Sequence, residues 1–135
     1  MSCTQEKLHL TFYMKNTYQT GLRGEQTAAA WLKQHYGMRL LESRYRNKAG
    51  EIDLIMLDGD TIVFVEVKTR MKALPGNGLL AVDQNKQRRI ARAALMYLIG
   101  NGWQNRCVRF DVAEVSGSGV LYVPDAFQPG GMFYR

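Results

Sequence analysis

The chain has 135 residues, of which 46% are hydrophobic and 22% charged, a composition typical of one folded domain and not of a disordered or fibrous chain. The net charge of +6 favours a polyanionic partner, either nucleic acid or an anionic membrane surface. No stretch reaches the roughly 18 apolar residues of a membrane span, no signal-peptide pattern opens the chain, and Cys3 and Cys107 lack metal-binding spacing. We therefore expect a cytoplasmic protein with free thiols.

Residues 1–19 show no pattern that ties them to a core. We predict that they form a poorly ordered arm, with Met14 as an alternative start, and that residues 20–135 form a single domain. A helix is expected from about Gly21 to Tyr36, because an inward apolar stripe recurs there at helical spacing, formed by Ala28, Ala29, Leu32 and Tyr36. Glu25 lies on the same apolar stripe, which favours an inward and functional position. The simpler alternative is a solvent-facing acid that the helix macrodipole stabilises.

The pattern then changes from helix to strand. Residues 38–46 predict a strand, and residues 47–50 predict a turn into a hairpin. The hairpin strands have the sequences GEIDLIML and TIVFVEVKTR, and Asp58-Gly59-Asp60 lies between them. Both runs are rich in β-branched residues and too short for typical helices, and Asp-Gly between such runs is a strong hairpin signal.

Four charged residues of this hairpin form two pairs, and the two members of each pair lie on the same face of their strand. Because side chains alternate along a strand, Glu51 lies on one face with Asp53, and Glu66 shares a face with Lys68. A two-residue turn would place Asp53 opposite Phe64 and diagonal to Glu66, whereas a four-residue loop would place Asp53 directly opposite Glu66. Either register brings both acids and the lysine to one face.

This clustering of acids is energetically unfavourable without a cation. The run around Glu66 is apolar on both faces, so the strand is expected to be buried. Two carboxylates about 4 Å apart repel by roughly 4 kcal/mol at an effective dielectric near 20. A divalent ion removes the repulsion, and Lys68 beside it suits a phosphate or an attacking water. The alternative is a solvated hairpin face, which the apolar surroundings disfavour.

A second helix is predicted from about Asp83, as N-cap, to Ile99. Its first turns carry four basic residues where the helix dipole disfavours cations: Lys86, Arg88, Arg89 and Arg92. The alternatives are a solvated basic face and contact with a phosphate backbone, and the neighbouring acids favour phosphate contact. Lys86 straddles the basic and inward faces, so we expect it nearest the scissile phosphate. Strands over residues 106–115 and 120–123 complete the sheet.

The chain resembles a known family at several separate motifs. Asp53, Glu66 and Lys68 match the metal-nuclease pattern of the PD-(D/E)xK superfamily. The longer match is to the YraN-like family of small bacterial proteins, relatives of the archaeal Holliday-junction resolvases. The matching stretches are Gly21-x-x-Gly24-Glu25-x-x-Ala28, Gly50-Glu51-Ile52-Asp53-Leu54-Ile55, Val63-Phe64-Val65-Glu66-Val67-Lys68-Thr69-Arg70, Ala81-Val82-x-x-x-Lys86 and Arg109-Phe110-Asp111-Val112.

The resemblance implies an α/β fold with a restriction-endonuclease-like core, in which helices flank a mixed central sheet in the order α-β-β-β-α-β-β. It also implies Mg²⁺ or Mn²⁺ as cofactor and DNA as partner, with no membrane, and a homodimer would suit a four-way junction. By resemblance Asp53 and Glu66 are metal ligands together with the Val67 carbonyl, Lys68 is catalytic and Glu25 is an accessory acid. Glu25 or Glu51 could hold a second ion or orient the attacking water.

The predicted nucleic-acid-binding residues are Lys86, Arg88, Arg89, Arg92, Arg70 and Arg46. Two positions depart from the family pattern: Leu74-Pro75-Gly76 replaces an aromatic residue before glycine, and Arg44 replaces asparagine. We expect a metal-dependent endonuclease that acts on DNA, with branched or structured DNA as one substrate class. The alternatives are a non-catalytic nucleic-acid-binding protein that keeps the fold, and a membrane-surface or assembly protein supported only by net charge.

Overall fold

The computed structural model describes residues 17–70 and 82–129. They form α2 (Thr17–Tyr36), β1 (Arg39–Asn47), β2 (Gly50–Asp58), β3 (Thr61–Arg70), α3 (Gln84–Gly100), β4 (Val108–Ser116) and β5 (Gly119–Val123). The predicted order of elements is confirmed. The first helix begins at Thr17, earlier than the predicted Gly21, so the end of the predicted arm belongs to it. The rest of that arm and the stretch Leu74-Pro75-Gly76 lie outside the described residues.

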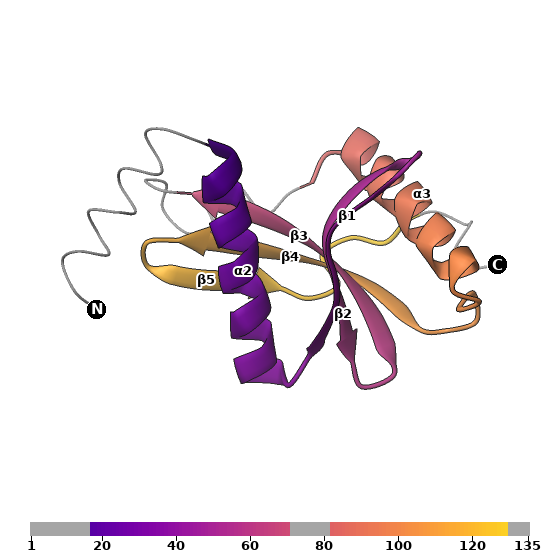
Figure 1. Cartoon of the computed structure of the whole chain (residues 1–135), viewed down its shortest axis with the longest axis horizontal. Helices are drawn as coiled ribbons and strands as arrows, with labels where there is room; N and C mark the ends of the chain where they lie inside the picture. The colour runs from indigo at the N-terminus through magenta and orange to yellow at the C-terminus, as the bar shows by residue number, and fades with distance from the viewer. Residues whose placement is uncertain (1–16, 71–81, 130–135) are drawn as a thin grey trace.

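The five strands form one mixed sheet in the order β1-β2-β3-β4-β5 (Figure 1). β1, β2 and β3 are antiparallel neighbours, and β5 is antiparallel to β4. Only β3 and β4 are parallel, and α3 lies between them in the chain. A parallel pair requires a crossover connection of this kind.

The β2–β3 hairpin has the register that the longer predicted loop would give. Asp58 pairs with Thr61 and Leu54 pairs with Val65, with Gly59 and Asp60 at the turn. Gly59 has φ +60°, a conformation that glycine adopts at little cost. Continuing the register by one residue brings Asp53 level with Glu66.

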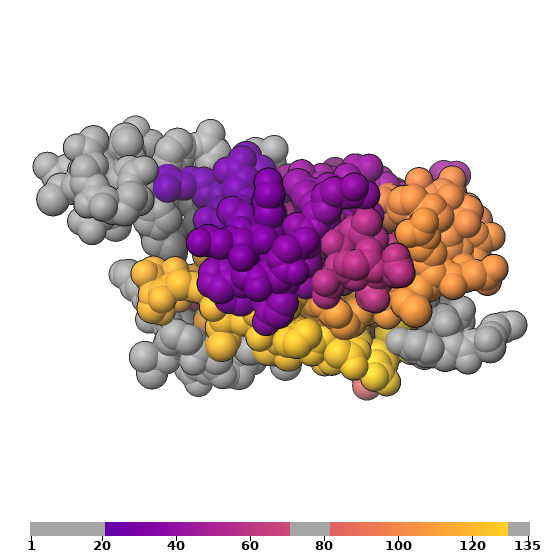
Figure 2. All heavy atoms as spheres, turned by 90° about the horizontal axis from the view of Figure 1, so that it is seen from below, coloured from indigo at the N-terminus to yellow at the C-terminus, as the bar shows by residue number. Residues whose placement is uncertain are grey.

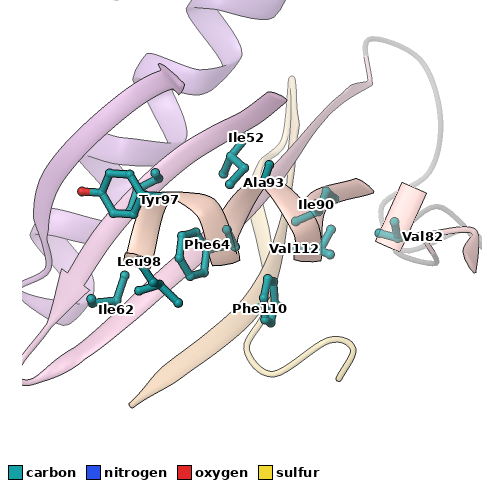
Figure 3. Packing of buried hydrophobic residues seen from close by; sticks show 12 residues of the cluster. Ile52, Ile62, Phe64, Val82, Ile90, Ala93, Tyr97, Leu98, Phe110 and Val112 are labelled. Carbon is teal, nitrogen blue, oxygen red and sulfur yellow. The ribbon is translucent and has the colours of Figure 1, made fainter. Parts of the chain in front are cut away.

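The helices pack on opposite faces of the sheet. Alternate residues of β3 belong to two separate cores: Ile62 and Phe64 face α3, whereas Val63 and Val65 face α2. Figure 3 shows the first of these cores, where the α3 residues Ile90, Ala93, Tyr97 and Leu98 lie over the sheet residues Ile52, Ile62, Phe64, Phe110 and Val112. In the second core Ala28 and Leu32 of α2 are fully buried.

One predicted inward residue is placed differently. Tyr36, at the end of the apolar stripe of α2, is 49% exposed. The helix ends at this residue, and the Tyr36 ring packs against Tyr122 of β5 with centroids 5.5 Å apart. Figure 2 shows α2 beside the yellow C-terminal region on this face of the molecule. Neither α2 nor α3 is apolar enough along its length to cross a membrane.

Candidate functional site

The candidate site lies where β2 and β3 separate. β2 and β3 are paired only as far as Leu54 and Val65, although β2 begins at Gly50 and β3 continues to Arg70. Beyond that point β2 remains paired with β1, and β3 remains paired with β4. The side chain of Asp53 lies at this fork, where its Oδ2 accepts a hydrogen bond of 2.8 Å from the backbone N–H of Val67.

The fork also interrupts the alternation of β2. Ile52 and Ile55 belong to the same core, on the side of α3, although residues an odd number apart in a regular strand face opposite ways. Leu54 and Met56 belong to the other core. The irregularity therefore falls at Asp53, and simple alternation does not carry through it to Glu51.

The two acids of the fork are buried together. Glu66 is 6% exposed, and Asp53 is partly buried beside it. Burial, with the neighbouring charge of Glu66 as the next cause, raises the pKa of Asp53 to about 8, against the opposing effect of the Val67 hydrogen bond. The carboxylate of Glu66 therefore disfavours ionisation of Asp53. An added cation would remove that penalty.

Lys86 brings one cation to the pair. Its Nζ forms a salt bridge with Glu66 Oε2 from the first turn of α3. Burial alone would lower the pKa of Lys86, but the hydrogen bond and charge of Glu66 raise it above its usual value. Asp83 is the N-cap of the helix, as predicted, and accepts a bond of 2.9 Å from the Lys86 backbone N–H. The cap thus fixes the turn that carries Lys86.

Lys68 lies on the same side of β3 as Glu66, two residues further along. In the parallel β3–β4 pair Lys68 is level with Glu114, and side chains in register on neighbouring strands point to the same face. Glu114 is 1% exposed. The sequence reasoning missed this acid, although the signal was available: Glu114 interrupts an apolar strand as Glu66 does.

Glu25 reaches the site from α2. It is 8% exposed, and its Oε1 accepts a bond of 2.8 Å from Arg44 Nε of β1. Burial raises the pKa of Glu25, Arg44 opposes the rise, and the charges of Glu51 and Glu66 add to it. Glu25 therefore has the inward position that the helical stripe predicted, close enough to Glu51 and Glu66 for their charges to act on it.

Gly24 permits this approach of α2 to the sheet. Thr69 follows Lys68 in β3, and a Cβ at Gly24 would lie 2.2 Å from its Oγ1. Contacts this short are not tolerated without movement of the helix or of Thr69. The glycine of the Gly-Glu motif therefore sets the distance between Glu25 and the end of β3.

We expect Gly24→Ala to destabilise the protein by about 1–3 kcal/mol, because overpacking outweighs the gain in helix propensity of about 1 kcal/mol. Gly100→Ala in α3 is the matched control, since a Cβ at Gly100 meets nothing within 4 Å. Urea unfolding of both variants checks this. A Gly24→Ala protein as stable as Gly100→Ala would contradict the role of the close packing.

The remaining predicted residues lie around this centre. Glu51 is paired with Arg46 at 2.8 Å, where both side chains are exposed. Arg70 follows Lys68 on β3, and its buried Nε has no hydrogen-bond partner within the described residues. Arg88 contacts Asn85. Arg89 and Arg92 are exposed on α3, and the backbone of Arg89 lies 3.5 Å from the Cβ that Gly50 would carry.

The donor set suits a hard divalent cation. No group of three or more His, Cys, Asp or Glu residues gathers as a metal site within residues 17–70 and 82–129. Mg²⁺ is nevertheless usually held by one or two carboxylates with water and substrate phosphate. The Asp53–Glu66 pair supplies those two carboxylates, and the raised pKa of Asp53 indicates that the pair lacks a sufficient counter-charge. The residues present therefore fit such an ion.

The five-stranded mixed sheet, the two flanking helices and the acids at the strand fork define an α/β protein with a restriction-endonuclease-like core. A model of the uncharacterised protein family UPF0102 matches residues 24–115, and the chain belongs to this family.

Several UPF0102 proteins are similar over most of this chain. One from Syntrophus aciditrophicus is 45% identical over 123 residues, covering 88% of this chain and 96% of that protein. One from Geobacter metallireducens is 42% identical over 112 residues, covering 80% and 91%. One from Chromohalobacter salexigens is 48% identical over 98 residues, covering 73% and 78%.

Proposed function

We propose that this protein is a Mg²⁺- or Mn²⁺-dependent endonuclease that hydrolyses DNA phosphodiester bonds. The observation that carries the proposal is the pair of acids at the strand fork, Asp53 and Glu66, with Lys86 bonded to one of them. Buried carboxylates in contact require a cation or a proton. The ammonium groups beside them suit an anionic substrate.

Each residue of the site has a proposed role. Asp53 and Glu66 hold the ion, with the Val67 carbonyl as a third ligand. The ion would polarise a phosphoryl oxygen and lower the pKa of a bound water. Lys68 orients the attacking water or stabilises charge that develops at phosphorus. Lys86, 43% exposed on a flexible stem, can exchange its bond to Glu66 for one to a substrate phosphate.

The proposed DNA-binding surface is the N-terminal half of α3 together with Arg46 and Arg70. Arg88, Arg89 and Arg92 are exposed there, on the same helix end as Lys86, which bonds to Glu66. Arg70 at the end of β3 is partly exposed, and its guanidinium suits a phosphate. Branched or otherwise structured DNA is the proposed substrate, by resemblance to Holliday-junction resolvases. A homodimer acting in the cytoplasm would suit a four-way junction.

Cleavage of labelled DNA tests the proposal and its alternative. Linear, flapped and four-way DNA are incubated with the wild-type protein in Mg²⁺, in Mn²⁺ or in a chelator, and with Asp53→Asn. We expect metal-dependent cleavage by the wild type alone. Tight binding of DNA by both proteins without cleavage would instead identify a non-catalytic nucleic-acid-binding protein.

The role of the α3 arginines has its own test. In the variant Arg88→Gln/Arg89→Gln/Arg92→Gln we expect weaker DNA binding, and a log-affinity versus log-salt slope shallower by up to about 0.9 for each lost phosphate contact. Contacts to phosphates carry no sequence information, so the loss should be similar for different sequences. Fluorescence anisotropy over a salt series measures both quantities.

A matched control separates location from net charge. The variant Lys33→Gln/Arg39→Gln/Arg106→Gln also removes three positive charges, from exposed positions outside the first turns of α3. It should retain most of the DNA affinity. Equal losses in the two triple variants would show that the basic face of α3 is not the binding surface.

A further inference from the structure

Arg44 is an unusual strand residue beside the acids. Its φ is +50°, in the left-handed region that residues other than glycine rarely adopt and that asparagine and aspartate tolerate best. β1 is paired with β2 on both sides of it, through Ser43 with Leu54 and Tyr45 with Ile52. Arg44 is therefore level with Asp53 across the strand pair, at the start of the fork.

The guanidinium of Arg44 is held by α2. Its Nε donates to Glu25 Oε1 at 2.8 Å, with the two side chains 26% and 11% exposed. A Cβ at Gly21 would lie 3.3 Å from Arg44 Nη2, so the glycine leaves room for the guanidinium at the helix. A partly buried ion pair of this kind is screened less than an exposed one, and breaking it leaves a charge uncompensated.

Arg44 and Lys86 differ in the kind of cation that they bring to the acids of the site. Arg44 carries a charge that it cannot lose by deprotonation, and its planar group matches a carboxylate. Lys86 pairs with Glu66 through a mobile ammonium that remains 43% exposed. A divalent ion can therefore displace Lys86 from Glu66 into solvent. A divalent ion at Glu25 would have to approach or displace a partly buried guanidinium, and the like charges would repel.

We propose that Arg44 takes the place of a second divalent ion, so that this site binds one ion, on Asp53 and Glu66, while Glu25 stays paired with the guanidinium. The inference rests on the proposed metal-dependent function and narrows it to a single-ion centre. Glu25 then acts as a positioning residue: it holds Arg44, and through Arg44 the strand that lies beside Asp53. Glu51 likewise binds no ion in this proposal and keeps its exposed salt bridge with Arg46.

Titration calorimetry with Mn²⁺ counts the ions without any need for activity. The wild type should bind one ion per chain, and Asp53→Asn should bind none. Arg44→Asn, which suits the left-handed backbone, should bind a second ion that is lost again in Arg44→Asn/Glu25→Gln. Arg44→Lys keeps the charge and should bind one. Circular dichroism establishes that each variant is folded.

The outcomes separate this inference from the function on which it rests. Two ions in the wild type, or one ion in a folded Arg44→Asn protein, would overturn the single-ion inference and leave a metal-dependent nuclease standing. No ion in the wild type would overturn the proposed function itself. If Arg44→Asn does not fold, Glu25→Gln is measured in its place. Wild type and Glu25→Gln should then each bind one ion. Two ions in the wild type and one in Glu25→Gln would refute the proposal, because Glu25 would then hold the second ion.

Discussion

Lys68→Ala is expected to slow DNA cleavage by about 10²–10³-fold while leaving the fold and the binding of divalent metal intact, because the lost ammonium acts on charge that develops during the reaction. Lys68 is two residues beyond Glu66 on the same side of β3, and is itself not one of the proposed metal ligands. Single-turnover cleavage measures the rate, and calorimetry with Mn²⁺ measures the metal affinity.

Lys68→Arg distinguishes a specific ammonium from a general positive charge. A planar guanidinium cannot replace a compact ammonium, so this variant should recover little activity. Cleavage by Lys68→Ala at the wild-type rate would remove Lys68 from the mechanism. Loss of metal binding in a folded Lys68→Ala protein would show that the lysine supports the ion instead of the substrate.

Asp53→Asn is expected to abolish metal binding and at the same time to stabilise the metal-free protein, by about 1–3 kcal/mol at neutral pH. The folded-state pKa of Asp53 is raised from 3.8 to about 8, by burial first and by Glu66 next. Ionisation is therefore unfavourable in the folded protein. An amide has no charge to bury and can still accept the hydrogen bond from Val67.

The dependence on pH follows from the direction of this shift. Below about pH 4 the carboxyl is protonated in both states and the difference between variant and wild type is small. Between about pH 4 and pH 8 the carboxyl of Asp53 ionises in the unfolded chain but not in the folded protein, so the wild type loses stability relative to Asp53→Asn. Above about pH 8 it is ionised in both states, and the difference in unfolding free energy no longer grows. Urea unfolding in a chelator over this range measures the difference. A difference that does not change with pH would contradict the assignment.

Much of the fold was predictable because local patterns and tertiary packing agree. The run around Glu66 is apolar on both faces, and it forms the buried β3 between two helices. Asp83 at the start of a basic and apolar run is the observed N-cap. The loop length of the hairpin was open from the sequence. The observed register pairs Asp58 with Thr61, and so brings Asp53 level with Glu66.

Other features of the site depend on contacts between elements, which no local pattern specifies. The salt bridge from Lys86 to Glu66 requires α3 to pack with its first turn over β3. The salt bridge between Glu25 and Arg44 requires α2 to approach the sheet closely. In the sequence, only Gly21 and Gly24 indicate such an approach. Arg44 was visible as a departure from the family pattern, but its left-handed backbone was not. The position of Glu114 in an apolar run was visible in the sequence, but its place level with Lys68 follows only from the strand order.

The proposed function depends above all on Asp53 and Glu66 forming the metal centre. Crystals of the protein soaked in Mn²⁺, with data collected at the manganese edge, test this claim most directly. We predict one strong anomalous peak per chain, within coordination distance of both carboxylates, and its disappearance in Asp53→Asn. Manganese bound elsewhere, with Asp53 and Glu66 free of it at a saturating concentration, would contradict the central claim.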